Sequence, residues 1–167
     1  MKFQVRNVRS DGEWQQACWL LHQVYVNGGF TTDQQAAALM VRERFENQCE
    51  TIVAVHDDGC VWGAVLFLNE PSSLSQLAQA GEREFRLLGV AEASRGQGVG
   101  QSLVQACIDR AHAAGAASLV LWTQPKMLAA QRLYERLGFE RWPSRDQSDE
   151  RGFTRLVYVR NCLNQRC

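Results

Sequence analysis

The sequence lacks the features that mark several classes of protein. It has no apolar run approaching the ~20 residues of a membrane span. Its charge is balanced, because Lys+Arg and Asp+Glu are both 18 among 167 residues. The N-terminal stretch MKFQVRNVRSDGEW has no apolar core of the kind found in signal peptides. These absences argue against a membrane protein and against a protein that binds nucleic acid through a broad basic surface. We therefore expect a cytoplasmic protein with no membrane and no nucleic-acid partner.

Metal-binding and disulfide patterns are missing as well. The six cysteines include no pair with C-x-x-C spacing, and the three histidines are isolated along the chain. We therefore expect no metal site, and reduced thiols that pack as small hydrophobic side chains. Cys162 and Cys167 lie in a polar C-terminal segment and are expected to be exposed.

What is present is the composition of an ordinary globular protein, 46% hydrophobic and 22% charged. The length predicts a single domain over residues 1–167. Hydrophobic periodicity predicts the order βααβββαβαββ and therefore one mixed α/β sheet. The helices are expected at 11–26, capped by Asp11, at 33–47, capped by Asp33, at 99–114 and at 125–137. The strands are expected at 3–8, 51–55, 60–68, 83–90, 118–123, 139–142 and 153–160, with a polar loop at 143–152.

The stretch SRGQGVGQSL (94–103) places three alternating glycines between a strand that ends at Val90 and a helix that begins near Val99. Unpartnered N–H groups and the macrodipole make a helix start partly positive. Glycine lets a large anion come close to that backbone, and Arg95 adds a donor that suits phosphate. The stretch therefore predicts a phosphate-binding loop. A glycine turn packed tightly between strand and helix is the structural alternative.

Two common phosphate-binding motifs do not fit this loop. A dinucleotide fold requires G-x-G-x-x-G, and Gln101 stands where the last glycine is needed. A nucleotide-triphosphate loop requires G-x-x-x-x-G-K-[ST], and no lysine follows here.

The loop instead resembles the pattern [QR]-x-x-G-x-[GA] of the GNAT superfamily of N-acetyltransferases, with Arg95, Gly98 and Gly100 at its fixed positions. Residues 84–111 resemble the family's fourth strand, pyrophosphate loop and third helix. Residues 119–141 resemble its fifth strand and fourth helix, including the signature A-x-x-L-Y-x-x-x-G-F. The resemblance implies an α/β (α+β) fold: a mixed, mostly antiparallel sheet of about seven strands with four helices, splayed between strands 4 and 5.

The same resemblance implies acetyl-coenzyme A as co-substrate, without a metal, and a primary amine of a small molecule or peptide as acceptor. It also admits a homodimer. Thr123 stands where many members have asparagine. The residues expected to contact the coenzyme are Leu88, Gly89, Val90, Arg95, Gly96, Gln97, Gly98, Val99, Gly100 and Thr123.

Acetyl transfer to an amine needs proton transfers, because an alkyl ammonium has a pKa near 10 and cannot attack until it loses a proton. Glu84 occupies the place of a glutamate found in many relatives and is the expected general base. Glu82 is a weaker choice, and a chain of water molecules is the alternative to both. Tyr134 is expected to protonate the leaving thiolate or to donate a hydrogen bond to it. The N–H of Val90 is expected to stabilise the oxyanion.

The acceptor region is predicted only in outline. Tyr25 and Phe30 are candidates for an apolar pocket, and Asp146, Asp149 and Glu150 are candidates for attracting a cation. Ordinary polar loops are the alternative reading of these segments. Two other functions remain open at this point: a protein that senses acyl-coenzyme A without turnover, and a nucleotide-binding protein of another α/β class.

Overall fold

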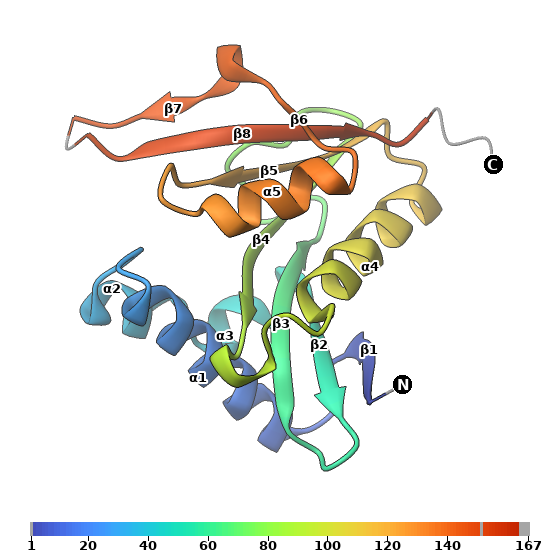
Figure 1. Cartoon of the computed structure of the whole chain (residues 1–167). Helices are drawn as coiled ribbons and strands as arrows, with labels where there is room; N and C mark the ends of the chain where they lie inside the picture. The colour runs from blue at the N-terminus through green and yellow to red at the C-terminus, as the bar shows by residue number, and fades with distance from the viewer. Residues whose placement is uncertain (1, 151, 164–167) are drawn as a thin grey trace.

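The computed structural model describes residues 2–150 and 152–163. Within these residues one sheet holds eight strands in the order β1-β2-β3-β4-β5-β8-β6, with β7 paired to β8 (Figure 1). Only the β4–β5 pair is parallel. The strands are β1 (Phe3–Asn7), β2 (Cys49–His56), β3 (Val61–Leu68), β4 (Glu82–Val90), β5 (Ser118–Thr123), β6 (Glu140–Arg141), β7 (Gln147–Ser148) and β8 (Thr154–Asn161).

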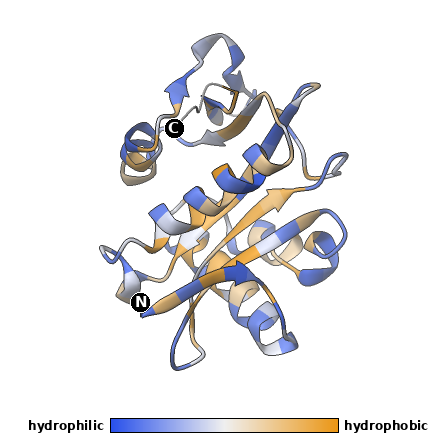
Figure 2. Cartoon of the chain, turned by 90° about the vertical axis from the view of Figure 1, so that its right-hand side faces the viewer, coloured by the Kyte–Doolittle hydropathy of each residue, from blue (hydrophilic) through white to orange (hydrophobic). Residues whose placement is uncertain are grey.

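The helices cover both faces of this sheet. Side chains of α4 and α5 pack in one hydrophobic cluster with strand residues such as Phe85 and Leu121. Side chains of α1, α2 and α3 pack in a second cluster with β2 and β3, on the other face. Figure 2 shows the resulting pattern, with apolar residues concentrated on the central strands and polar residues on the outer helix surfaces. The helices are α1 (Asp11–Asn27), α2 (Asp33–Leu39), α3 (Arg42–Phe45), α4 (Val99–Ala113) and α5 (Leu128–Arg136).

The predicted fold class is confirmed: a mixed, mostly antiparallel sheet with α-helices on its faces. The described residues contain eight strands rather than about seven, because two residues of the polar loop, Gln147 and Ser148, pair with β8. They contain five α-helices rather than four, because the helix predicted at 33–47 is interrupted. Met40 has φ −89° and ψ 64°, and Val41 is extended, so α3 begins as a separate turn. No helix among the described residues is long and apolar enough to cross a bilayer.

Both predicted helix caps are wrong by one residue. The cap of α1 is Ser10, whose hydroxyl accepts a hydrogen bond from the Glu13 amide at 3.2 Å. The cap of α2 is Thr32, which forms a reciprocal capping box with Gln35. Aspartate at the first helical position still interacts favourably with the helix dipole, and that preference misled the prediction.

Two further details differ from expectation near the C-terminal half. α5 begins at Leu128 and not at Pro125, because residues 125–127 form a turn. Cys162 was expected to be exposed and is only 3% exposed; it packs in the cluster that contains α4. The prediction for Cys167 falls outside the described residues.

The sheet separates between β4 and β5, as predicted. Parallel pairing joins only Glu82–Glu84 to Ser118–Val120. Beyond that point β4 stays paired with β3, and β5 stays paired with β8. A bulge accompanies the separation: Leu87 has φ +58°, which is uncommon for a residue other than glycine. We call the unpaired stretch, residues 85–90 of β4 and 121–123 of β5, the splay (Figure 1).

Candidate active site

The splay leaves polar backbone groups of β4 without a strand partner. The amide of Ala91 donates to the Trp62 carbonyl of β3 at 2.8 Å. Backbone groups alternate in direction along a strand, so the N–H and C=O of Val90 point away from β3. The Leu88 carbonyl has a partner outside the sheet, since it accepts a hydrogen bond from the Tyr25 hydroxyl at 3.2 Å. An extended ligand with amide groups can therefore pair with Leu88 and Val90 as a strand would.

Gly89, between these two residues, serves packing rather than ligand contact. A Cβ atom at this position would lie 3.0 Å from Leu21 Cδ2 and 3.3 Å from Leu20 Cδ2. The absence of a side chain thus lets α1 pack directly on β4. Of the three β4 residues predicted to contact the coenzyme, the structure directs Leu88 and Val90 toward the splay and gives Gly89 a role in packing.

The N-terminus of α4 is open and carries no side-chain cap. Gly98 is the N-cap residue, with φ +80°, and the first intrahelical hydrogen bond runs from Ser102 N–H to its carbonyl at 3.0 Å. The amides of residues 99–101 therefore have no partner within the helix. Gly96 also has a positive φ, +76°, and both glycines have open space where a side chain would stand. Backbone conformation, not tight packing, explains glycine at these two positions.

Gly100 connects this helix start to the splay. A Cβ atom there would lie 3.6 Å from Val90 Cγ2 and 3.4 Å from Leu133 Cδ2. Arg95, Gly96, Gln97 and Gly98 are exposed, whereas Val99 is buried in the core. Hollows of about 450 Å³ and 390 Å³ flank the loop, one beside Arg95 and one beside Gln97. The structure thus brings the predicted phosphate loop and the free edge of β4 together.

Thr123 ends β5 and is 2% exposed. Its hydroxyl donates to Met127 Sδ at 3.3 Å, so it is used to hold the turn that leads into α5. The placement does not support a contact between this hydroxyl and the coenzyme.

Tyr134 lies in an aromatic cluster on the α4–α5 face of the sheet. Its ring centroid is 5.9 Å from those of Phe85, Phe139 and Tyr158. No hydrogen bond among the described residues involves its hydroxyl. Burial raises the pKa of Tyr134 well above its ordinary value, and the neighbouring Tyr25 contributes in the same direction. The phenol is therefore a hydrogen-bond donor at neutral pH and a poor source of a proton.

Glu84 is placed differently from the expected base. It is 1% exposed, and its Oε1 accepts hydrogen bonds from the Ser75 hydroxyl and the amides of Leu77 and Ala78 at 2.9–3.0 Å. The Gln76 amide is 3.2 Å from both carboxylate oxygens. Three successive amides that converge on one carboxylate form an anion-binding turn. The structure supports Glu84 as the anchor of residues 75–78 and does not support a direct contact with an acceptor amine.

Glu82, the weaker choice for a base, is also engaged. Its carboxylate pairs with Arg145 at 2.9 Å and accepts a hydrogen bond from Ser118 at 2.9 Å. Burial raises the pKa of Glu82, but the hydrogen bonds from Arg145, Gln79 and Ser118 outweigh it and leave the pKa below its usual value. A carboxylate in this setting is a weak proton acceptor.

The predicted acceptor residues are partly brought together. Tyr25 and Phe30 meet edge to face with ring centroids 6.1 Å apart. Gln124, just beyond β5, donates to the Phe30 carbonyl at 3.0 Å and so ties the α1–α2 loop to the splay. An additional contact of 2.6 Å between His22 and Asp33 fixes the start of α2 against α1.

Two of the acidic residues in the 143–152 loop, proposed to attract a cation, are engaged in contacts within the C-terminal strands. Asp146 pairs with Arg141 at 2.7 Å and accepts the Val157 amide at 2.9 Å. Asp149 accepts the Phe153 amide at 3.0 Å, and Glu150 is exposed. Asp146 therefore ties the start of β7 to Arg141 and β8, and Asp149 shapes the β7–β8 turn. Among the described residues no group of three or more metal-ligating side chains is present.

Sequence reasoning missed three residues beside Glu84. Arg86 follows Glu84 on the same face of β4, and the guanidinium carbons of Arg86 and Arg155 lie 5.8 and 5.0 Å from the centroid of Trp122. Tryptophan in a strand predicts a core residue, yet Trp122 is only half-buried. We call Arg86, Trp122 and Arg155 the arginine–indole cluster. The available signal was the strand alternation that places Glu84 and Arg86 on one face.

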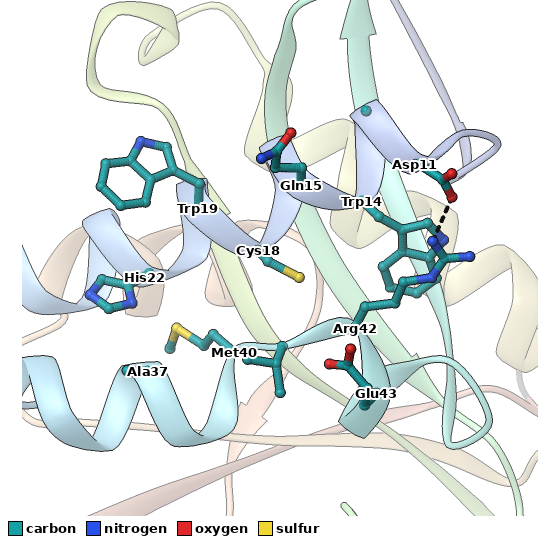
Figure 3. Close-up of a pocket in the computed structure, with 12 residues that line it drawn as sticks. Asp11, Trp14, Gln15, Cys18, Trp19, His22, Ala37, Met40, Arg42 and Glu43 are labelled. Atoms are coloured by element: carbon teal, nitrogen blue, oxygen red, sulfur yellow. Dashed lines mark hydrogen bonds and ion pairs between the residues drawn. The ribbon is translucent and has the colours of Figure 1, made fainter.

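A further groove of about 610 Å³ lies between α1, α2 and α3 (Figure 3). Its walls include Trp14, Cys18 and Met40, and an ion pair of 2.6 Å between Arg42 and Asp11 crosses one end. Desolvation raises the pKa of Cys18 to about 11, so this thiol stays protonated at neutral pH. The groove contains none of the residues predicted to bind coenzyme or to act in catalysis.

Comparison with known sequences points to one family. Residues 13–139 match the sequence profile described as Acetyltransferase (GNAT) family. Over 59 residues the chain is 42% identical to mycothiol acetyltransferase from Streptosporangium roseum and 39% identical to the protein of the same name from Renibacterium salmoninarum. Each match covers 35% of this chain and 18% of the relative, so the aligned segment spans less than a fifth of the length of these relatives.

Solved structures share the whole architecture. A GCN5-related N-acetyltransferase from Kribbella flavida is 26% identical, with a TM-score of 0.69 over 96% of this chain and 98% of that chain. An acetyltransferase of the GNAT family from Staphylococcus aureus has a TM-score of 0.73 at 14% identity, over 96% and 99% of the two chains. The PaiA N-acetyltransferase from Thermoplasma acidophilum in complex with coenzyme A has a TM-score of 0.70 at 11% identity, with the same coverage. The last two likenesses concern the fold alone.

Proposed function

Because the chain belongs to the acetyltransferase (GNAT) family, we propose that it transfers an acetyl group from acetyl-coenzyme A to a primary amine of a small molecule or peptide. One observation carries the proposal: the free edge of β4 in the splay leads directly to the uncapped N-terminus of α4. The amides at this helix start can bind a diphosphate, and the free strand edge can pair with the amide groups of the arm attached to that diphosphate.

The residues present fit the coenzyme. The exposed loop from Arg95 to Gly98 and the amides of Val99 and Gly100 would hold the diphosphate, because no side chain caps this helix start. The backbone of Leu88 and Val90 would pair with the pantetheine arm. The Tyr25–Leu88 hydrogen bond would have to yield to that pairing or share the Leu88 carbonyl with it.

The reaction forms a C–N bond between the amine and the acetyl carbonyl carbon and breaks the C–S bond. One proton leaves the amine, and one proton ends on the thiol. The N–H of Val90, directed into the splay, would donate to the developing oxyanion. Glu84 and Glu82 are held by other groups, so we assign proton removal to water rather than to either carboxylate.

Tyr134 would act as a hydrogen-bond donor to the leaving sulfur. A thiol has a pKa of roughly 8.5, by analogy with cysteine, against about 10 for tyrosine. Proton transfer from even an ordinary tyrosine to the thiolate is therefore uphill by about 2 kcal/mol. Burial raises the pKa of Tyr134 further, which makes full proton transfer still less favourable. The hydroxyl would stabilise the thiolate without losing its proton.

We expect the Tyr134→Phe variant to retain its fold and to lose about tenfold in kcat, the worth of one hydrogen bond to a charged group. Because the phenol does not ionise near neutral pH, the pH–rate profiles of the two enzymes should keep the same shape up to about pH 9. Tyr158→Phe is the matched control. Tyr158 belongs to the same aromatic cluster, but its hydroxyl binds Glu135 at 3.3 Å. Equal steady-state rates for Tyr134→Phe and wild type, with chemistry rate-limiting, would remove this tyrosine from the mechanism.

The proposed function is tested by measuring release of free thiol from acetyl-coenzyme A with a panel of amines and peptides. We expect amine-dependent release, and thermal stabilisation by coenzyme A but not by NAD or ATP, because only a ligand that binds the folded state raises its apparent stability. Binding of coenzyme A without thiol release for any amine would reduce the protein to an acyl-coenzyme A binding module.

A further inference from the structure

The arginine–indole cluster lies on the face of β4 that carries Glu84, at the start of the splay. Arg86 is the second residue after the last β4–β5 pair, and Leu88 follows two residues later, across the bulge at Leu87. Arg155 and Trp122 reach the same place from β8 and β5. The cluster is therefore within the length of a small molecule from the backbone that would hold the thioester.

Among the ion pairs of the described residues, none includes either guanidinium group of the cluster. Five other arginines form ion pairs with acidic side chains: Arg6, Arg42, Arg110, Arg141 and Arg145. In contrast, among the described residues Arg86 donates to the Leu74 carbonyl, at 3.0 Å, and Arg155 donates to the Gln147 side chain, at 3.3 Å. Among the hydrogen bonds of the described residues, none uses Nη2 of Arg86 or of Arg155.

These nitrogens are not completely buried. The Nε atoms of Arg86 and Arg155 are buried without partners, whereas their Nη2 atoms are not among the buried unpartnered atoms of the described residues. Desolvation lowers the pKa of Arg86 and outweighs Glu84 and Tyr25, which raise it; the nearby charges of Arg155 and Arg44 lower it further. An anion bound between the guanidinium groups would offset both effects.

The carboxylate that acts on Arg86 among the described residues, Glu84, is already occupied. Glu84 interacts with Arg86 electrostatically, but its oxygens receive the hydroxyl and amides of residues 75–78. The same segment fixes the indole, since Gln76 Oε1 accepts the Trp122 Nε1–H at 2.8 Å. Glu84 thus positions the platform on which the two arginines stack, and it leaves their outer donors free.

We propose that the arginine–indole cluster binds a carboxylate group of the acceptor, so that the physiological acceptor is a small amine carrying an acid, of the amino-acid type. Guanidinium groups recognise carboxylates through paired N–H donors, which makes this acid the natural complement of the free Nη2 atoms. The aromatic pair Tyr25–Phe30 is available for an apolar part of the same molecule. This inference rests on the proposed acetyl transfer.

The experiment compares matched amines with and without the α-carboxylate: L-methionine with L-methioninamide, and L-phenylalanine with L-phenylalaninamide. We expect kcat/KM from thiol release to favour the acid of at least one pair by ten- to a hundredfold, the usual range for a charge-assisted contact. The Arg155→Gln variant should bring this ratio close to one, and Arg155→Lys should retain part of it. Arg9→Gln, which changes an exposed arginine on another part of the surface, should leave the ratio unchanged.

A binding measurement separates this inference from the proposed function. The same pairs are titrated into the protein with coenzyme A present, and the thermal midpoint is recorded for wild type, Arg86→Gln and Arg155→Gln. Stabilisation by an acid but not by its amide, lost in both variants, supports the acid site even if no amine is acetylated. The acid site is wrong if amides bind and react as well as acids, or if the preference survives both substitutions. Thiol release that favours neutral amines would leave acetyl transfer standing and overturn only the acid site.

Discussion

We expect the Glu84→Gln variant to lower the free energy of unfolding by about 2 kcal/mol, while kcat of the folded enzyme stays within about threefold of wild type. The substitution places an NH₂ group against amides that now donate to a carboxylate. Some of these buried donors then lose their acceptor. A buried donor without a partner destabilises the folded state by its full desolvation penalty. For a chain of this size the loss corresponds to a thermal midpoint lower by about 4–8 °C.

Chemical denaturation measures the stability of the variant and of wild type. Thiol release measures their activities, and each activity is normalised to the concentration of folded protein. Glu135→Gln is the matched control: it makes the same change at an exposed carboxylate that accepts one hydroxyl. This control should cost less than about 0.5 kcal/mol. General-base catalysis contributes about 10²–10⁴-fold. If the Glu84→Gln variant kept wild-type stability but its kcat fell by that factor, Glu84 would be the general base.

The second large effect concerns the helix start. We expect Gly98→Val to weaken binding of coenzyme A by at least about 30-fold, because it alters the one position that leaves the α4 amides uncovered. Valine is strained at φ +80°, and relief of that strain would turn the amides of residues 99–101 away from a common ligand. Loss of even one charge-assisted hydrogen bond to the diphosphate costs about 1.5–3 kcal/mol.

Gly115→Val separates this effect from backbone strain in general. Gly115 ends the same helix with φ +71° and equally open surroundings, roughly 25 Å from Gly98 at 1.5 Å per residue. Both variants should lose similar stability, and only Gly98→Val should lose affinity for coenzyme A in calorimetric titration. Equal affinities in the two variants would mean that the diphosphate does not use this helix start.

Local sequence rules predicted the parts of the site that are local in the chain. The strand at 82–90, the glycine loop and the helix from Val99 form one continuous segment, and each element is specified by its own periodicity and its own glycines. The free edge of β4 could be predicted only from the family resemblance. The residue pattern of one strand does not indicate whether the neighbouring strand will diverge from it.

The environment of Glu84 could not be predicted in the same way. Its partners come from residues 75–78, a segment with no periodicity, and they are backbone amides that carry no sequence signature. The presence of glutamate in a strand does not indicate whether the side chain faces solvent, substrate or an anion-binding turn. Only the fold shows which of these applies.

The arginine–indole cluster was missed for a related reason. Its three members come from three strands, and the longest gap between them in sequence exceeds thirty residues. Pairing between β5 and β8 and the start of the splay bring them to one place. The break between α2 and α3 was also beyond local rules, because a run of helix-forming residues continues through Met40 and Val41.

The central claim is that the uncapped amides of α4 bind a diphosphate and thereby direct a thioester along the free edge of β4. The most direct test is a crystal structure of the protein with coenzyme A. We predict diphosphate oxygens within about 3 Å of the amides of Val99 and Gly100, and a pantetheine arm hydrogen-bonded to Val90. Coenzyme bound elsewhere, with this helix start holding no phosphate, would contradict the account.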